Sequence, residues 1–366
     1  MLRSRETSIR LHTLGWALLA VLFLLGLPLL LGISPLVPAV VFALGALLAA
    51  GLWWIALRVR GRTRTRRALG AAALTGGMLL TGLLSLPLYW LVLQPALNPL
   101  LMPRVTMTDG RRTLVFQGMT HIGSALFYRS VAFDLMPARE AGSVLYFEGV
   151  LGGTPDAKAW FDAAVGAGDG LNEDYARIAR VCGLHFQNDF LDALIRDSGP
   201  HPERTVDADV SETEMMIEWQ RLVAQQPQLG EALARAHADA GDGPSGLDRM
   251  ADMLGRVGPR QQPFVGAACR GVITYALGRP ESPDVLNPVV LDFRNRKLAE
   301  RVVASTADDL YLVYGAGHLP GFVRELRRLD PAWTISGATW STAIQSPDHG
   351  VGRLQVDADA MLPVPR

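Results

Sequence analysis

The sequence is poor in cysteine, in lysine and, over its first hundred residues, in acidic side chains. Its 366 residues include only two cysteines, Cys182 and Cys269. Two cysteines are too few for a disulfide framework or a thiolate zinc site. One structural disulfide outside the cytoplasm is one interpretation, and two buried thiols that pack as small apolar groups is the simpler one. Lysine occurs only at positions 158 and 297, so arginine supplies nearly all of the positive charge.

Charge is distributed unevenly along the chain. Glu6 is the only acidic residue before Arg104, whereas residues 105–366 contain 25 basic and 34 acidic residues, a net charge of −9. Because phosphate binding needs clustered cations, the acidic remainder argues against a nucleic-acid partner. The neutral total therefore combines a basic membrane part with an acidic soluble part.

Long uncharged runs predict a membrane anchor, and so a lipid bilayer as a partner. No charge occurs between His12 and Arg58, which is room for two spans of about 20 residues with a Gly- and Pro-containing turn between them. A third uncharged run includes Tyr89 and Trp90, which suit a membrane interface. We predict a cytoplasmic tail at 1–12, three transmembrane helices at about 13–32, 37–57 and 69–93, a linker at 94–108, a soluble domain at 109–346 and a C-terminal tail at 347–366.

The arginines predict the orientation of this anchor. Residues 58–67 contain six arginines in ten positions, and the N-terminal tail contains three more. Short cationic segments stay in the cytoplasm, so an odd number of spans places the soluble domain outside it. A cleaved signal peptide would need a small-residue cleavage site followed by soluble sequence, whereas more apolar sequence follows the first run.

Beyond residue 103 the pattern alternates between short apolar runs and amphipathic segments. We predict strands at 112–118, 143–148, 205–210, 310–314 and within 333–344, and helices at 124–139, 157–165, 172–181, 212–226, 285–305 and 319–329. Ser211 and Glu214 form a capping-box pattern at the start of one of these helices. Alternation of this kind predicts an α/β fold, a mixed domain built around a central sheet.

Three ionisable residues follow predicted strands. His121 and His318 each end a Gly-x-x-His motif between a strand and a helix, and Glu148 is the last residue of strand 143–148. Sites in α/β sheets gather where strands end. Two imidazoles and one carboxylate are a ligand set for catalytic zinc, and they also suit manganese or cobalt. Each histidine taken alone is better explained as a hydrogen-bonded core or loop histidine, and Glu148 is also explained by a helix cap or by an ion pair, for example with Arg294.

Five short motifs in order resemble the TraB/PrgY/GumN family, to which the Tiki proteins belong. They are Gly118–His121, Tyr146–Gly149, Ala208–Val210, Arg294–Arg296 and Gly315–His318, and the resemblance covers about residues 110–345. It implies a metal-dependent protease with paired Gly-x-x-His motifs and an essential glutamate. Its functional positions fall on His121, Glu148, Arg294 and His318. Two features depart from the family: the first motif reads Gly-Met-Thr-His, where Gly-Thr-x-His is commoner, and the predicted spans precede the domain.

These observations predict a membrane-anchored, extracytoplasmic, metal-dependent hydrolase, with a peptide or protein as its substrate. His121, Glu148 and His318 would hold a divalent ion (manganese, cobalt or zinc), and Arg294 would stabilise an oxyanion or hold a substrate carboxylate. The His-Glu-x-x-His signature of many metalloproteases is absent from the sequence. The alternative is a non-catalytic protein that binds a peptide or haem at the cell surface.

The distribution of arginine leads to a prediction of topology. A reporter that is active only outside the cytoplasm should be inactive when fused at Gly61 and active when fused at Gly152, because Gly61 lies in the arginine-rich loop. The opposite activities at these two positions would contradict the predicted orientation.

Overall fold

The structure is a computed structural model. It describes residues 15, 16, 20, 36–59, 66–165, 171–196, 201–240, 252, 256, 258, 262–279 and 284–345. The chain forms two compact units: Met1–Asn98, Arg256–Tyr275 and Ser346–Leu354 make up the first, and Pro99–Gly255, Ala276–Gln345 and Gln355–Arg366 the second. Each unit is described separately below.

Two long apolar helices dominate the described part of the first unit. They are α2 (Leu36–Val59) and α3 (Arg66–Leu97), and both are long and apolar enough to cross a membrane. They coincide with the second and third predicted spans. The first predicted span, at 13–32, lies outside the described residues except for three helical positions. At about 1.5 Å per residue α3 is roughly 48 Å long, which exceeds the roughly 30 Å hydrocarbon core of a bilayer.

Small residues bring α2 and α3 into close contact. A Cβ atom on Gly45 would lie 2.5 Å from the carbonyl oxygen of Gly76, and one on Gly77 would lie 2.8 Å from the ring of Phe42. Thr81 and Ser85 continue the buried side of α3 at four-residue spacing from Gly77. Such stripes of small residues let helices pack closely in a bilayer, where dispersion contacts replace the hydrophobic effect between helices.

The second unit is built on one six-stranded mixed sheet with the strand order β6-β4-β7-β2-β1-β8. Strands β6, β4, β7 and β2 are parallel to one another, while β1 is antiparallel to both β2 and β8. The strands are β1 (Leu101–Thr108), β2 (Thr113–Met119), β4 (Val144–Phe147), β6 (Thr205–Asp207), β7 (Asp309–Gly315) and β8 (Thr334–Thr342). A separate two-stranded ladder pairs β3 (Ile122–Gly123) with β5 (His185–Phe186).

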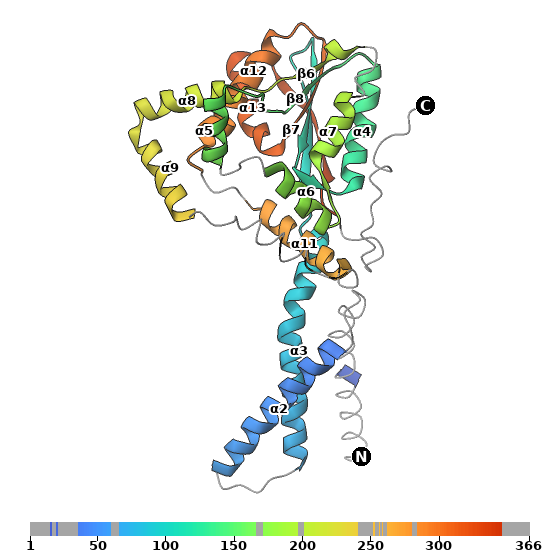
Figure 1. Ribbon diagram of the computed structural model, residues 1–366. Helices are drawn as coiled ribbons and strands as arrows, with labels where there is room; N and C mark the ends of the chain where they lie inside the picture. The colour runs from blue at the N-terminus through green and yellow to red at the C-terminus, as the bar shows by residue number, and fades with distance from the viewer. Residues whose placement is uncertain are drawn as a thin grey trace. The chain divides into compact units, whose positions relative to one another are not determined.

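Helices cover both faces of the parallel half of this sheet (Figure 1). On one face Leu298 of α12 and Phe322 of α13 pack with Leu312 of β7 in a continuous core. The opposite face carries α4 and α7. The helical elements of this unit are α4 (Ala125–Glu140), α5 (Pro155–Val165), α6 (Leu171–Val181), α7 (Gln187–Arg196), η1 (Pro202–Arg204), α8 (Glu212–Gln225), α9 (Pro227–Ala240), the π-helical η2 (Pro288–Phe293), α12 (Arg294–Ala304), η3 (Ala316–His318) and α13 (Leu319–Leu329).

The predicted mixed α/β fold with a central sheet is confirmed, and so is the capping box at Ser211. The predicted linker at 94–108 is wrong in its second half, which forms β1. Its prolines hid the strand pattern, but a strand accepts a proline such as Pro103 where no N–H is needed for pairing. The helix predicted at 285–305 begins with a π-helical turn instead of regular α-helix. No cysteine in the described part of the chain is free, which contradicts the interpretation as two buried thiols.

The close contact of α2 with α3 leads to a prediction about packing. Gly76→Val should lower the melting temperature of the detergent-solubilised chain, because overpacking costs typically about 1–3 kcal/mol. Gly70→Val on the same helix is the control, since a Cβ there meets no atom within 4 Å. Equal melting temperatures for the two variants would contradict the contact.

Candidate functional site

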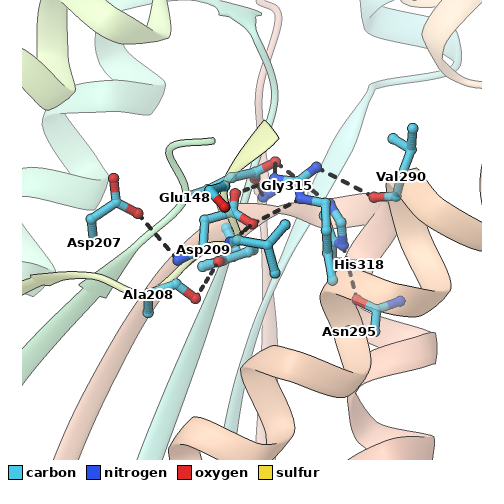
Figure 2. A network of polar contacts seen from close by, with 12 residues as sticks. Glu148, Asp207, Ala208, Asp209, Val290, Asn295, Gly315 and His318 are labelled. Carbon is cyan, nitrogen blue, oxygen red and sulfur yellow. Dashed lines mark hydrogen bonds and ion pairs between the residues drawn. The ribbon is translucent and has the colours of Figure 1, made fainter. Parts of the chain in front are cut away.

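Polar residues converge where four neighbouring parallel strands end. Glu148 follows β4, Asp209 lies two residues after β6, His318 lies three residues after β7 and His121 lies two residues after β2. The order β6-β4-β7-β2 puts all four strand ends at one edge of the sheet. The structure thus brings His318 and Glu148 together (Figure 2). Arg294, at the start of α12, pairs with Glu148 in the same cluster.

Glu148 is held at both carboxylate oxygens. Its Oε1 atom accepts a hydrogen bond of 2.7 Å from a terminal nitrogen of Arg294, and its Oε2 atom accepts one from the backbone N–H of Gly315. A Cβ atom at position 315 would lie only 3.0 Å from Oε2, so a glycine lets the backbone come this close. Burial raises the pKa of Glu148, but Arg294, His318 and the Gly315 N–H outweigh burial and hold that pKa well below its usual range.

Arg294 joins two carboxylates in a buried cluster. Its Nε atom donates to Asp209 at 2.9 Å, one terminal nitrogen donates to both Asp209 and Glu148, and the other donates to the carbonyl of Val290 at 3.3 Å. The side chains of Arg294 and Asp209 are 7% and 1% exposed. A guanidinium that is this buried, with every nitrogen engaged, is placed to position carboxylates and not to meet a ligand in solvent.

His318 lies against Glu148 and is oriented by a neighbouring amide. Its Nδ1 atom is 2.9 Å from Oδ1 of Asn295, and its Nε2 atom is 3.5 Å from Oε1 of Glu148 (Figure 2). Asn295 itself fits because residue 321 is glycine: a Cβ atom there would collide with the Asn295 amide. Since Oδ1 of Asn295 can only accept, Nδ1 of His318 is the donor in this contact, and the other ring nitrogen, Nε2, faces Glu148.

His121 lies at the same sheet edge but stands apart from this network. Its backbone carbonyl accepts from the N–H of Gln187 at 2.9 Å, and its ring stacks on Tyr175 of α6 with centroids 4.8 Å apart. The ring is exposed to solvent. Neighbouring atoms still desolvate it and lower the pKa of His121; Glu148 opposes that shift, and Arg294 and His318 reinforce it. A neutral imidazole is the form that binds metals.

Asp207 adds a carboxyl group with an unusual acidity beside the cluster. Its Oδ1 atom accepts from the Asp209 N–H at 3.1 Å, and its Oδ2 atom lies beside Gly149. Desolvation, reinforced by the negative charge of Asp209, raises the pKa of Asp207 to about 6. Glu148 and Asp207 therefore form a pair of carboxyl groups whose surroundings move their pKa values in opposite directions, an arrangement typical of sites that handle protons.

Sequence reasoning found Glu148 and His318 but gave Asp207, Asp209 and Asn295 no role. The structure shows instead that Asp209 is buried and that Asn295 is 2% exposed. The available signal was local: Asp209 stands between Ala208 and Val210, and an aspartate flanked by apolar residues after a strand needs a buried partner.

The cluster is not a complete metal site by itself. Within the described ranges, no three histidine, cysteine, aspartate or glutamate side chains are gathered closely enough to hold a metal ion. Comparison with known proteins found no matching family model, no matching curated protein and no matching solved structure.

The raised pKa of Asp207 leads to a prediction about pH and stability. The folded-state pKa of Asp207, about 6, exceeds the unfolded value of about 3.8, so ionisation of this carboxyl group opposes folding. The resulting loss in the free energy of unfolding is absent below about pH 3.8 and complete above about pH 6. Asp207→Asn should therefore raise the free energy of unfolding by about 1–2 kcal/mol at pH 8, after allowance for solvent screening, and have little effect at pH 4.

Chemical denaturation of the full chain in detergent at the two pH values measures this difference. Asp309→Asn is the control, because Asp309 is exposed at the start of β7 in the same sheet. If Asp207→Asn raises the free energy of unfolding by the same amount at pH 4 and pH 8, folding does not disfavour ionisation of Asp207 and the prediction is contradicted.

Proposed function

We propose that the chain is a membrane-anchored, metal-dependent hydrolase of the TraB/GumN type that acts on peptides outside the cytoplasm. The observation that carries this proposal is the pair formed by Nε2 of His318 and Oε1 of Glu148, 3.5 Å apart. With Nδ1 engaged by Asn295, these two atoms are both hydrogen-bond acceptors in the neutral state of the ring. A cation between the two atoms would satisfy both of them, as would a proton on Nε2 that is donated to Glu148.

The spacing of His318 and Glu148 would suit a divalent ion as that cation, with a third ligand brought in from elsewhere. Zinc bonds to histidine nitrogen and to carboxylate oxygen are about 2.0–2.2 Å long, so two ligands of one ion lie roughly 3–3.5 Å apart. The Asn295 contact on the far nitrogen of His318 is the outer contact that ligating histidines usually have. The charge balance agrees, since Glu148 and Asp209 share one guanidinium and leave a net charge of −1.

His121 is the proposed third ligand. It belongs to the same sheet edge, and Glu148, Arg294 and His318 all influence its pKa, so the four side chains lie within electrostatic range of one another. In the described contacts no hydrogen-bond partner occupies either ring nitrogen of His121. Its lowered pKa keeps the imidazole neutral. Manganese, cobalt and zinc all suit two imidazoles and one carboxylate.

The chain's own groups would support hydrolysis in distinct ways. A bound divalent ion supplies a water of lowered pKa and polarises the scissile carbonyl. Arg294 holds the carboxylate of Glu148 in its ionised, oriented form, which is a positioning role and replaces the oxyanion contact expected from the sequence. Asp207 can accept or release a proton near neutral pH because its pKa is about 6.

Three features support the proposed membrane anchor and the extracytoplasmic location of the second unit. The two described helices α2 and α3 are long and apolar enough to cross a bilayer, and the arginines between them favour a cytoplasmic loop. A third span at 13–32 completes the proposed topology. The absence of a free cysteine in the described part of the chain suits an oxidising compartment.

A non-catalytic role as a peptide-binding protein is the competing proposal. It is favoured by the Arg294 cluster, in which the guanidinium is already paired with Asp209 and Glu148, as in a structural ion network. The metal distinguishes the two proposals, because a structural network has no need of one.

The proposed ligands lead to a prediction about bound metal. His318→Ala and Glu148→Gln should each lower the divalent metal content of the purified full chain, measured by elemental analysis, and should abolish chelator-sensitive peptide hydrolysis. Asn295→Ala should weaken metal affinity by about 10- to 100-fold, as the loss of an outer contact does. Arg294→Lys should retain metal but lose turnover, because lysine cannot hold two carboxylates in one plane.

His201→Ala is the matched control, since His201 is exposed and pairs only with Glu203 among the described contacts. Melting temperatures of all variants separate loss of metal from loss of fold. Unchanged metal stoichiometry in folded His318→Ala and Glu148→Gln proteins would refute the ligand assignment and leave the cluster as scaffold.

A further inference from the structure

Tyr314, the last residue but one of β7, is buried beside the candidate site, with 1% of its surface exposed. It belongs to the same apolar core as Leu312 and Ala208, on the side of the sheet that α12 and α13 cover. The next residue, Gly315, donates its backbone N–H to Glu148. The end of β7 therefore presents both a backbone donor and a phenol hydroxyl to the polar cluster.

The Tyr314 hydroxyl reaches past one strand to the next. In the sheet order β6-β4-β7, Val313 lies level with Phe147, and Phe147 lies level with Asp207. Tyr314 and Ala208 are the residues that follow on the two outer strands of this trio, so their backbones are about 10 Å apart. The hydroxyl spans this gap and donates to the Ala208 carbonyl at 2.9 Å.

The peptide group between Ala208 and Asp209 is held at both of its polar atoms. Its carbonyl accepts from Tyr314. Its N–H donates to Oδ1 of Asp207 at 3.1 Å (Figure 2). Rotation of this peptide plane would break a hydrogen bond to a buried carbonyl, and an unsatisfied buried group is costly. The plane therefore fixes where the chain places the Cα atom of Asp209, and with it the carboxylate.

Asp209 forms a two-point ion pair with Arg294. Its Oδ1 atom accepts from Nε of Arg294 at 2.9 Å, and its Oδ2 atom accepts from a terminal nitrogen. That terminal nitrogen also donates to Glu148 at 2.7 Å, so a displaced Asp209 would tilt the guanidinium away from Glu148. The ring of Tyr314 meets the other part of the site, because it packs edge to face on His318 with ring centroids 5.6 Å apart and planes at 89°.

We propose that Tyr314 is a positioning residue of the site, whose hydroxyl places Asp209 so that Arg294 can hold Glu148. It acts through the peptide group between residues 208 and 209. The competing account is that Tyr314 contributes only to the stability of the core, as any buried tyrosine does. The inference rests on the proposed hydrolase activity for its effect on turnover, whereas its effect on the Arg294 ion cluster is independent of that activity.

Hydrogen exchange of arginine side chains tests this proposal in the detergent-solubilised full chain, labelled with ¹⁵N-arginine. The Nε–H of Arg294 is bonded to Asp209, so its exchange rate reports how often that ion pair opens. The Nε–H of Arg112 is the internal reference, because it is bonded to Asp109 at 2.7 Å and lies just before β2, at the other end of the parallel strands. Each signal is assigned by its loss in Arg294→Lys or Arg112→Lys.

Tyr314→Phe removes the hydroxyl and retains the ring. It should speed exchange at Arg294 by about 3- to 10-fold relative to Arg112, which is the equivalent of one lost hydrogen bond. Tyr311→Phe is the matched control, since Tyr311 is also 1% exposed on β7 and its hydroxyl has no hydrogen-bond partner in the part of the chain that the structure describes. The control should leave the ratio of the two exchange rates unchanged.

Equal acceleration at both arginines in Tyr314→Phe would overturn the proposal, because the hydroxyl would then contribute only to global stability. An unchanged rate at Arg294 would overturn it as well. Where the wild-type chain shows chelator-sensitive peptide hydrolysis, Tyr314→Phe should also lower kcat by about 10-fold with little change in KM, as the loss of an outer contact does. A wild-type chain without hydrolysis would count against the proposed function, and the exchange rates would still decide the role of Tyr314.

Discussion

The buried ion cluster of Arg294 with Glu148 and Asp209 is the interaction on which the candidate site depends. Transferring these charges out of water is costly, and the cost is recovered only because the guanidinium engages both carboxylates and a backbone carbonyl at once. Removing one partner from such a cluster strands a buried charge, at a typical cost of about 3–5 kcal/mol. The same cluster joins three segments that are far apart in the chain: the end of β4, the end of β6 and the start of α12.

Everything else in the site is arranged around this cluster. Glycine at position 315 allows the β7 backbone to donate to Glu148, and glycine at position 321 leaves room for Asn295 to hold His318. The π-helical turn before Arg294 sets the register of α12, so that two consecutive polar residues, Arg294 and Asn295, both point away from solvent. π-Turns occur frequently at functional sites because they change which residues share a helix face.

The first unit relies on a different kind of interaction. Its described helices approach each other closely at backbone positions such as Gly45 and Gly76. In the proposed bilayer setting apolar side chains would gain little by leaving lipid, so this close packing would take the place of apolar burial. Electrostatics and hydrogen bonds shape the site of the second unit, whereas shape complementarity between small residues organises the described helices of the first.

The sequence by itself determined what local patterns can encode. Uncharged runs located α2 and α3, alternation of apolar runs and amphipathic segments gave a mixed α/β fold, and the positions of Glu148 and His318 after strands placed them at a sheet edge. These features depend on neighbours within a few residues, so no long-range contact is needed to recognise them.

Only the tertiary structure decided which partners those residues have. Asp209 meets Arg294 across 85 residues of sequence, Asn295 meets His318 across 23, and Gly271 meets Leu91 across 180. Whether a polar residue at a strand end or helix start is solvated or buried depends on the strand order and on the rotation of α12, neither of which is written in the spacing of nearby side chains. β1 was missed for the same reason: Pro103 weakens its local strand pattern, and pairing with β2 and β8 on both sides stabilises it.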